Sequence, residues 1–170
     1  MLEIALSGEE DWPSGIDWQK LAEQAAQAAI AETPHAGLAV GPIPAEISIR
    51  LTSDEEVHGL NRDYRDKDKP TNVLSFPMLE EEELGAASDA VGELLLGDIV
   101  LARGVCEREA AERNIAVATH ATHLIVHGTL HLLGYDHMMA DEADAMEAIE
   151  IRALARLGIA NPYADATGEE

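Results

Sequence analysis

Cysteines and aromatic residues are scarce in this chain of 170 residues. The one cysteine, Cys106, excludes an internal disulfide framework. Aromatic residues make up 4% of the sequence, which argues against a broad surface for stacking nucleic-acid bases. There is no apolar run of about 18 residues, so we expect no membrane span and no membrane partner. The acidic N-terminus does not resemble a secretory signal, and we expect a cytoplasmic protein.

Positive charge is also scarce, since 11 Lys and Arg face 33 Asp and Glu and give a net charge of −22. Phosphate binding needs a basic footprint, so this balance argues against nucleic acid as a partner. Five of the basic residues nevertheless fall close together: Arg50, Arg62, Arg65, Lys67 and Lys69. They are consistent with a basic strip on an acidic body. Because Asp63, Asp66 and Asp68 interleave with them, a solvated surface loop is the alternative.

The length and the hydrophobic content of 46% indicate a globular chain that buries about 70% of its unfolded surface. We find no internal repeat and no shift in composition, and therefore expect one domain over residues 1–170. Alternating apolar residues predict strands at 2–6, 46–51, 72–76 and 93–102. Helical spacing predicts helices at 18–32, 52–65, 103–114, 117–133 and 141–157.

Local signals support these boundaries. Asp17 is a plausible N-cap, and Thr52 or Ser53 followed three residues later by Glu forms a capping box. We expect a loop over residues 34–44, an end to the third strand at Pro77, and an acidic excursion over residues 80–92. Gly97 is a candidate bulge, and Gly158 a helix stop.

The order of these elements favours an α+β fold over a doubly wound sheet, because helices gather at the C-terminal end. We predict a small mixed sheet of about four strands with helices packed against it. The third and fourth strands should pair antiparallel. The helix over residues 117–133 is mostly apolar and should be buried on most sides.

The stretch HGTLHLLGYDH spaces three histidines at His127, His131 and His137. Residues four apart lie on one helix face, so the first two imidazoles can share an ion. Gly134 should end the helix and let the chain return His137 to the same point. Three nitrogen ligands leave one place open on a tetrahedral ion, as in catalytic zinc sites, although nickel and copper also accept imidazoles.

Two further residues, one within this stretch and one just before it, bear on the metal site. Asp136 is a candidate to hold a ligating imidazole by its other nitrogen. His123 could replace His131 as the helical partner of His127, but we expect it to pack or hydrogen-bond beneath the site. For His120, His58 and His35 we expect ordinary structural roles.

The same histidine offsets occur in zinc proteases with the motif H-E-x-x-H-x-x-G-x-x-H, where the Glu is the general base. Here that position is Gly128, which cannot take a proton. The sequence therefore predicts the metal scaffold of these proteases without their base. A peptidase would have to use Asp136 or a remote Glu.

HGTLHLLGYDH resembles the signature of the YbeY endoribonucleases, also called rRNA maturation factors. The stretches LNRDYRDKDKPTNVLSFP (60–77), LGDIVL (96–101) and ARLGIANPY (155–163) are similar to other blocks of that family. The resemblance covers roughly residues 46–163. It implies a metal-dependent hydrolase, usually with one zinc ion, that cleaves single-stranded RNA. It also implies 16S ribosomal RNA 3′-end maturation, late ribosome quality control, and ribosomal partners, with no DNA substrate expected.

By this resemblance the metal ligands are His127, His131 and His137, and the functionally important arginine is Arg65. We expect Arg65 to hold the scissile phosphate, with Lys67 and Lys69 steering neighbouring phosphates. An ion pair of Arg65 with a neighbouring aspartate is the ordinary alternative. Two other functions stay open: a zincin-like metallopeptidase, and a non-catalytic ribosome assembly factor stabilised by zinc.

Overall fold

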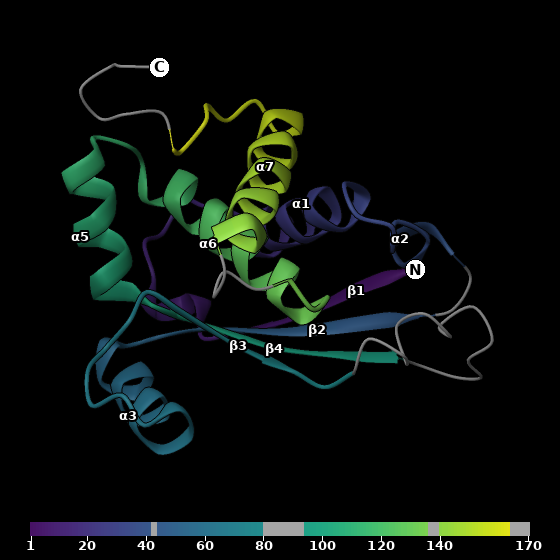
Figure 1. Cartoon of the computed structure of the whole chain (residues 1–170). Coiled ribbons are helices and arrows are strands. Elements are labelled where there is room, and N and C mark those ends of the chain that lie inside the picture. Colours follow the sequence, from purple (N-terminus) through teal and green to yellow (C-terminus); the bar gives the residue numbers. More distant parts are fainter. Residues whose placement is uncertain (42–43, 80–93, 136–139, 164–170) are drawn as a thin grey trace.

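A four-stranded mixed sheet is the frame of this protein (Figure 1). The computed structural model describes residues 1–41, 44–79, 94–135 and 140–163. The strands are β1 (Leu2–Ser7), β2 (Ala45–Thr52), β3 (Val73–Pro77) and β4 (Leu94–Ala102). Their order in the sheet is β1-β2-β4-β3. The first three in that order run parallel, while β3 pairs antiparallel with β4, as the sequence predicts.

Helices lie on both faces of this sheet. They are α1 (Trp18–Ala31), α2 (Gly37–Val40), α3 (Asp54–Arg65), α5 (Arg103–Arg113), α6 (Val117–Leu132) and α7 (Ala140–Arg156), with a short 3-10 helix η1 (Glu9–Asp11). Figure 1 shows α1, α6 and α7 on one face and α3 on the other. The predicted α+β fold with a mixed sheet is confirmed. In the described part of the chain, every helix is too short or too polar to cross a membrane.

The predicted capping residues are confirmed. The Asp17 carboxylate accepts a hydrogen bond from the backbone N–H of Lys20 at 3.0 Å, and the Ser53 hydroxyl accepts one from that of Glu56 at 3.2 Å. One detail of the prediction was wrong, because the expected loop over residues 34–44 contains α2. Its single turn is closed by a backbone hydrogen bond and secured by the buried side chain of Leu38. The predicted excursion over residues 80–92 lies outside the described residues.

Gly97 marks a bulge in β4, as predicted. Glu46 of β2 pairs with Leu95, but the next residue, Ile47, pairs with Gly97, so β4 carries one extra residue there. Gly97 has φ +147°, and a Cβ at this position would lie 2.4 Å from the carbonyl oxygen of Phe76. A larger residue would therefore push the edge strand β3 away from β4.

Two hydrophobic clusters cover opposite faces of the sheet. The larger one joins α1, α6 and α7 to one face and includes Ile99 and Leu101 of β4. The smaller one lies beneath α3 and includes Val57, Val100 and Ala102. Alternation along β4 sends neighbouring residues to the two clusters. The same alternation on β3 places Val73 against the larger cluster and Leu74 in the smaller one.

A buried histidine fixes the start of β3. The Glu109 carboxylate on α5 lies 2.7 Å from Nε2 of His120 on α6 and accepts a hydrogen bond from the Asn72 amide at 3.0 Å. Burial lowers the pKa of His120, even though Glu109 acts in the opposite direction. His120 thus has the structural role expected of it, and it joins α5, α6 and the edge strand.

Gly128 lies where α6 packs closely against the sheet. A Cβ at Gly128 would lie 2.9 Å from Cγ2 of Ile99 and 3.1 Å from the hydroxyl of Ser75. That hydroxyl donates a hydrogen bond to the Gly128 carbonyl at 3.3 Å. The glycine that follows His127 is therefore needed for packing, which gives the missing glutamate of the protease motif a structural reason.

We expect Gly128→Glu to lower the free energy of unfolding by about 3 kcal/mol or more, because it overpacks the interface and buries an unpaired carboxylate. Gly59→Glu is the matched control. A Cβ at Gly59 meets only Arg62, at 3.8 Å, so the same change should be neutral or stabilising. Urea unfolding followed by circular dichroism measures both variants. Equal stability of the two would contradict the close approach at Gly128.

Candidate metal and RNA site

The candidate site opens from the buried helix α6. From His120 to Leu132 every residue of this helix is buried except His127 and His131, which are partly exposed. Four residues of separation put both imidazoles on the same face of the helix, as the sequence predicts. The two imidazoles are thus the part of the buried stretch of α6 that solvent can reach.

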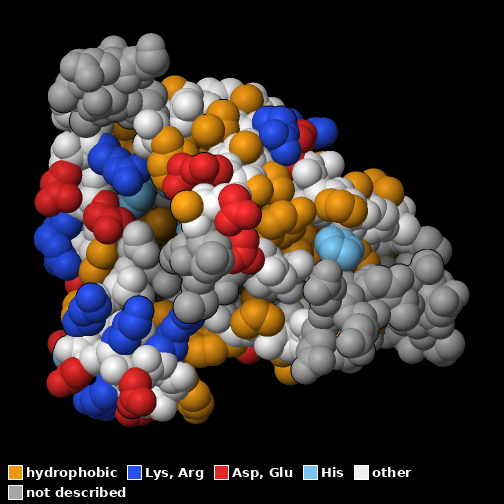
Figure 2. Space-filling view, viewed as in Figure 1, with side chains coloured by type: hydrophobic (Ala, Val, Ile, Leu, Met, Phe, Trp, Pro, Cys, Tyr) orange, Lys and Arg blue, Asp and Glu red, His pale blue; other side chains and the backbone are white. Residues whose placement is uncertain are grey.

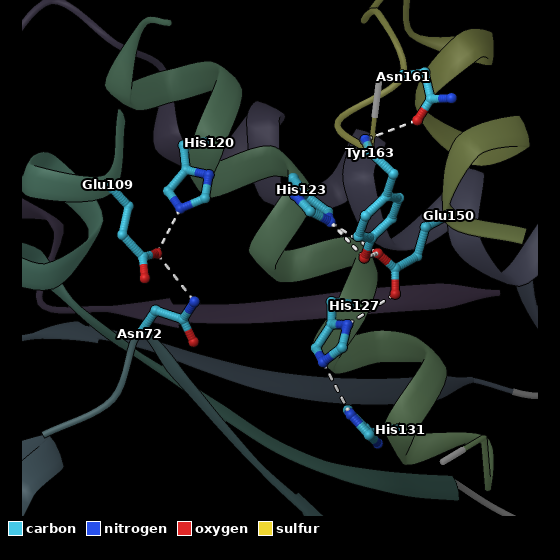
Figure 3. Close-up of polar contacts among 9 residues, drawn as sticks. All are labelled: Asn72, Glu109, His120, His123, His127, His131, Glu150, Asn161 and Tyr163. Atoms are coloured by element: carbon cyan, nitrogen blue, oxygen red, sulfur yellow. Dashed lines mark hydrogen bonds and ion pairs between the residues drawn. The ribbon is translucent and has the colours of Figure 1, made fainter. Parts of the chain in front are cut away.

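The two imidazoles point toward one another (Figure 3). Their Nε2 atoms are 3.0 Å apart, and the ring planes are inclined by 80°. His131 is held through Nδ1, which lies 2.9 Å from the carbonyl oxygen of Tyr135. A carbonyl only accepts, so Nδ1 of His131 carries the proton and Nε2 presents its lone pair when the ring is neutral.

The end of α6 is what orients His131. Gly134 takes φ +97°, and the backbone N–H groups of Gly134 and Tyr135 donate to the carbonyls of His131 and Leu130. This is the reversal that the sequence predicts at a glycine after the helix. It brings the Tyr135 carbonyl back to the imidazole of His131, one helical turn earlier. The glycine that ends the helix therefore also fixes the orientation of His131.

Glu150 of α7 orients the other ring. Its carboxylate is fully buried and lies 2.8 Å from Nδ1 of His127 and 2.7 Å from Nε2 of His123. The hydroxyl of Tyr163 donates to the same carboxylate. Burial alone would raise the pKa of Glu150, but the hydrogen bonds from His123, His127 and Tyr163 outweigh it and lower the pKa to about 2. The charged carboxylate therefore keeps the proton of His127 on Nδ1.

The pair fits a metal ion. With both Nδ1 atoms donating, two Nε2 lone pairs face each other, and a hydrogen bond between them would require one ring to be positively charged. A cation between them removes this repulsion. Zinc–nitrogen bonds of about 2.0–2.1 Å at a tetrahedral angle separate two nitrogens by roughly 3.3 Å, close to the observed 3.0 Å.

The third predicted ligand, His137, and Asp136 lie outside the described residues. Within residues 1–41, 44–79, 94–135 and 140–163, no three His, Cys, Asp or Glu side chains are grouped to hold a metal ion. The described half of the site is therefore the pair on α6. His123 lies beneath it on Glu150 and Tyr163, in the hydrogen-bonding position expected, and this arrangement favours His131 over His123 as the partner of His127.

Glu150 was not predicted from the sequence, although a signal for it exists. Met146, Ile149 and Leu154 are buried residues of α7, and Glu150 falls on the same apolar stripe. A carboxylate among core positions of an amphipathic helix needs a buried partner. The spacing shows that such a partner is needed, but not that it comes from α6.

The predicted basic strip lies around α3. Figure 2 shows Lys and Arg side chains gathered there, at the lower left, mixed with carboxylates. Arg50 is paired with Glu56 at 2.6 Å and Arg62 with Asp63 at 3.1 Å. The exposed side chains of Arg65, Lys67 and Lys69 make no ion pair within the part of the chain that the structure describes.

Arg65 does not reach the histidines. It is the last residue of α3, whereas His127 and His131 lie on α6, which packs on the opposite face of the sheet (Figure 1). The two groups are separated by the edge strand β3. The alternative ion pair of Arg65 with Asp63, Asp66 or Asp68 is not formed in the described residues either. Asp63 pairs with Arg62 and Asp68 with His58.

Together the fold and the site define a class: an α+β domain whose buried helix exposes a histidine pair suited to a divalent ion, with an exposed cluster of cations on the other side of the sheet. The family model described as Endoribonuclease YbeY matches residues 9–158. The chain belongs to the Endoribonuclease YbeY family.

The relatives cover the chain almost completely. The Endoribonuclease YbeY of Rhizorhabdus wittichii is 61% identical and that of Sphingopyxis alaskensis 56%, with 96% and 97% of this chain and 98% and 99% of the relatives covered. That of Zymomonas mobilis is 47% identical over the whole chain. The solution structure of a Thermotoga maritima protein matches with a TM-score of 0.51 and 24% identity, covering 93% of this chain and 92% of that one, which supports the fold alone.

We expect Glu150→Gln to lower the free energy of unfolding by about 1–3 kcal/mol, because the amide nitrogen cannot accept and one buried donor loses its acceptor. The control is Glu142→Gln in the exposed first turn of the same helix, with an expected effect within about 0.5 kcal/mol. Urea unfolding with a chelator present measures both without a contribution from metal. A Glu150→Gln protein as stable as the control would contradict the stabilising role of this carboxylate.

Proposed function

We propose that this endoribonuclease cleaves single-stranded RNA, ribosomal RNA above all, with one metal ion held by His127, His131 and His137. The observation that carries the proposal is the 3.0 Å approach of two Nε2 atoms whose rings are held through their other nitrogens. Metal dependence is general in this family. We propose zinc because three imidazoles suit it and leave a place open for substrate.

When bound, the ion supplies Lewis-acid polarisation of the phosphodiester and activation of water. Residues of the chain hold the proposed metal ligands in position. Glu150 and the Tyr135 carbonyl hold the two helical imidazoles, and we propose that Asp136 holds a further one. Arg65 binds a phosphate of the same strand through its planar fork, and Lys67 and Lys69 attract neighbouring phosphates.

The biological setting is also a proposal. We infer that the chain acts as a single domain in the cytoplasm, in 16S ribosomal RNA 3′-end maturation and late ribosome quality control. Contact with the ribosome or ribosomal proteins follows from such a role. The family name supports an RNA substrate, and the cations around α3 supply its electrostatic counterpart.

A metallopeptidase is the less favoured alternative. Peptide hydrolysis in the related histidine motif uses a glutamate at the position of Gly128. The 2.9 Å from a Cβ there to the Ile99 side chain leaves no room for that base. A non-catalytic assembly factor would need its metal site closed, whereas His127 and His131 both keep some exposure.

We expect His131→Ala to lower bound metal to a small fraction of the wild-type content and to abolish cleavage of single-stranded RNA, because it removes one of three proposed ligands. Elemental analysis and a gel assay measure the two effects, and casein tests for peptidase activity in parallel. Full metal occupancy in this variant would favour His123 as the ligand. Casein cleavage without RNA cleavage would support the peptidase instead.

We expect Arg65→Glu to reduce RNA cleavage by at least about 100-fold at unchanged metal content, since a phosphate contact becomes a repulsion. Lys20→Glu makes the same charge reversal at an exposed position of α1, away from α3, and should keep most of the activity. Gel assays at several salt concentrations and elemental analysis compare the variants. Equal cleavage by the Arg65→Glu protein would exclude a role for this arginine.

A further inference from the structure

The face of the sheet that carries α3 has a groove that the proposed chemistry does not use. Its volume is about 490 Å³, within the range of small-ligand sites of about 300–1,000 Å³. One wall comes from Tyr64 and Leu60 of α3 and from Phe76 of β3. Its floor includes Ser48 and Asp98, which pair with each other across β2 and β4.

Tyr64 gives this groove a stacking surface. Its side chain is 72% exposed, an unusual state for an aromatic residue in a chain with so few of them. The ring contacts Phe76 edge-on, with centroids 5.8 Å apart and planes inclined by 73°. The contact with Phe76 supports the tyrosine, and the exposed part of its ring is available to a second ring.

The charges around the groove favour one orientation of a bound nucleotide. Asp98 is exposed on the floor and makes no hydrogen bond or ion pair with any described residue. A carboxylate repels phosphate but accepts from an exocyclic amino group. Arg50 also lines the groove, but its charge is balanced by Glu56 at 2.6 Å. The exposed cations Arg65 and Lys67 lie one and three residues after Tyr64 in the chain. We therefore expect the phosphates of a bound nucleotide to lie outside the groove, over the end of α3, and its base to lie inside the groove.

The groove is connected to the histidine pair through one strand. On β3, Ser75 faces α6 and donates to the carbonyl of Gly128, the residue after His127. The next residue, Phe76, faces the groove. A single RNA strand passing over the edge of the sheet at β3 can thus reach both sides, which a base-paired duplex cannot do without opening.

We propose that this groove binds one unpaired base of the RNA substrate, stacked on Tyr64 and read at its amino group by Asp98. The base is adenine, cytosine or guanine and not uracil, which lacks an exocyclic amino group. This inference rests on the proposed function and deepens it, because it supplies a reason for the preference for single strands. It makes Tyr64 a residue of substrate specificity, distant from the reacting phosphate.

The test is the binding of fluorescent 12-nucleotide oligo(C), oligo(U) and an abasic oligomer to protein kept metal-free with chelator. We expect wild-type protein to prefer oligo(C). Tyr64→Ala should weaken oligo(C) binding about tenfold, within the range for one base–aromatic stack, while Tyr64→Phe keeps it. Asp98→Asn should reduce the difference between oligo(C) and oligo(U). Val40→Ala, which removes an 86% exposed apolar side chain from α2, is the control and should change nothing.

Three results would overturn the proposal: unchanged oligo(C) binding by Tyr64→Ala, equal binding of the abasic oligomer, or an equal loss for oligo(C) and the abasic oligomer. The last would indicate a role for Tyr64 in backbone or protein contacts. Cleavage assays of metal-loaded wild-type protein separate this failure from that of the proposed function. If wild-type protein cleaves RNA and Tyr64→Ala leaves oligo(C) binding unchanged, only the proposed base-binding groove is rejected. If wild-type protein neither binds nor cleaves RNA, the proposed function is rejected.

Discussion

The structure of the site depends on one buried carboxylate. Glu150 accepts from His123 and His127 of α6 and from Tyr163 beyond the end of α7, so a single charge joins two helices and the chain that follows them. Burying such a charge is costly unless hydrogen bonds surround it. The hydrogen bonds that offset this cost also choose the tautomer of His127. The same hydrogen bonds thus stabilise the fold and orient the imidazole of His127, so a substitution that removes them affects both.

Close packing of α6 is the second constraint, and it decides which chemistry the helix can support. Gly128 lets the helix backbone approach Ile99 and Ser75, while the imidazoles of His127 and His131 stay partly exposed. A glutamate at that position would keep the helix away from the sheet. The histidine spacing of the zinc proteases is retained here, but the position of their base is taken up by packing, so acid–base work must come from elsewhere.

The sequence predicts what is local. The 3.6-residue period brings His127 and His131 together, and Gly134 and Ser53 mark helix ends through hydrogen bonds within a few residues. Glu150 could not be assigned in this way, because 23 residues separate it from His127 and the crossing of α6 and α7 decides their contact. The same holds for Arg65. Its motif predicted a role beside the histidines, but only the fold shows that α3 lies on the opposite face of the sheet.

The net charge of −22 does not conflict with an RNA substrate, because electrostatic attraction is local at physiological salt. Screening acts over about 8 Å, so a phosphate over the end of α3 responds mainly to the local charges, Arg65, Lys67 and Lys69 with the aspartates between them, and weakly to the distant acidic surface. The acidic body raises the cost of binding a long duplex, whose phosphates extend beyond these few cations. A short unpaired segment stays close to these cations, and of the interleaved aspartates Asp63 and Asp68 are already paired with Arg62 and His58. The scarcity of basic residues therefore acts in the same direction as the groove beside Tyr64, toward single strands.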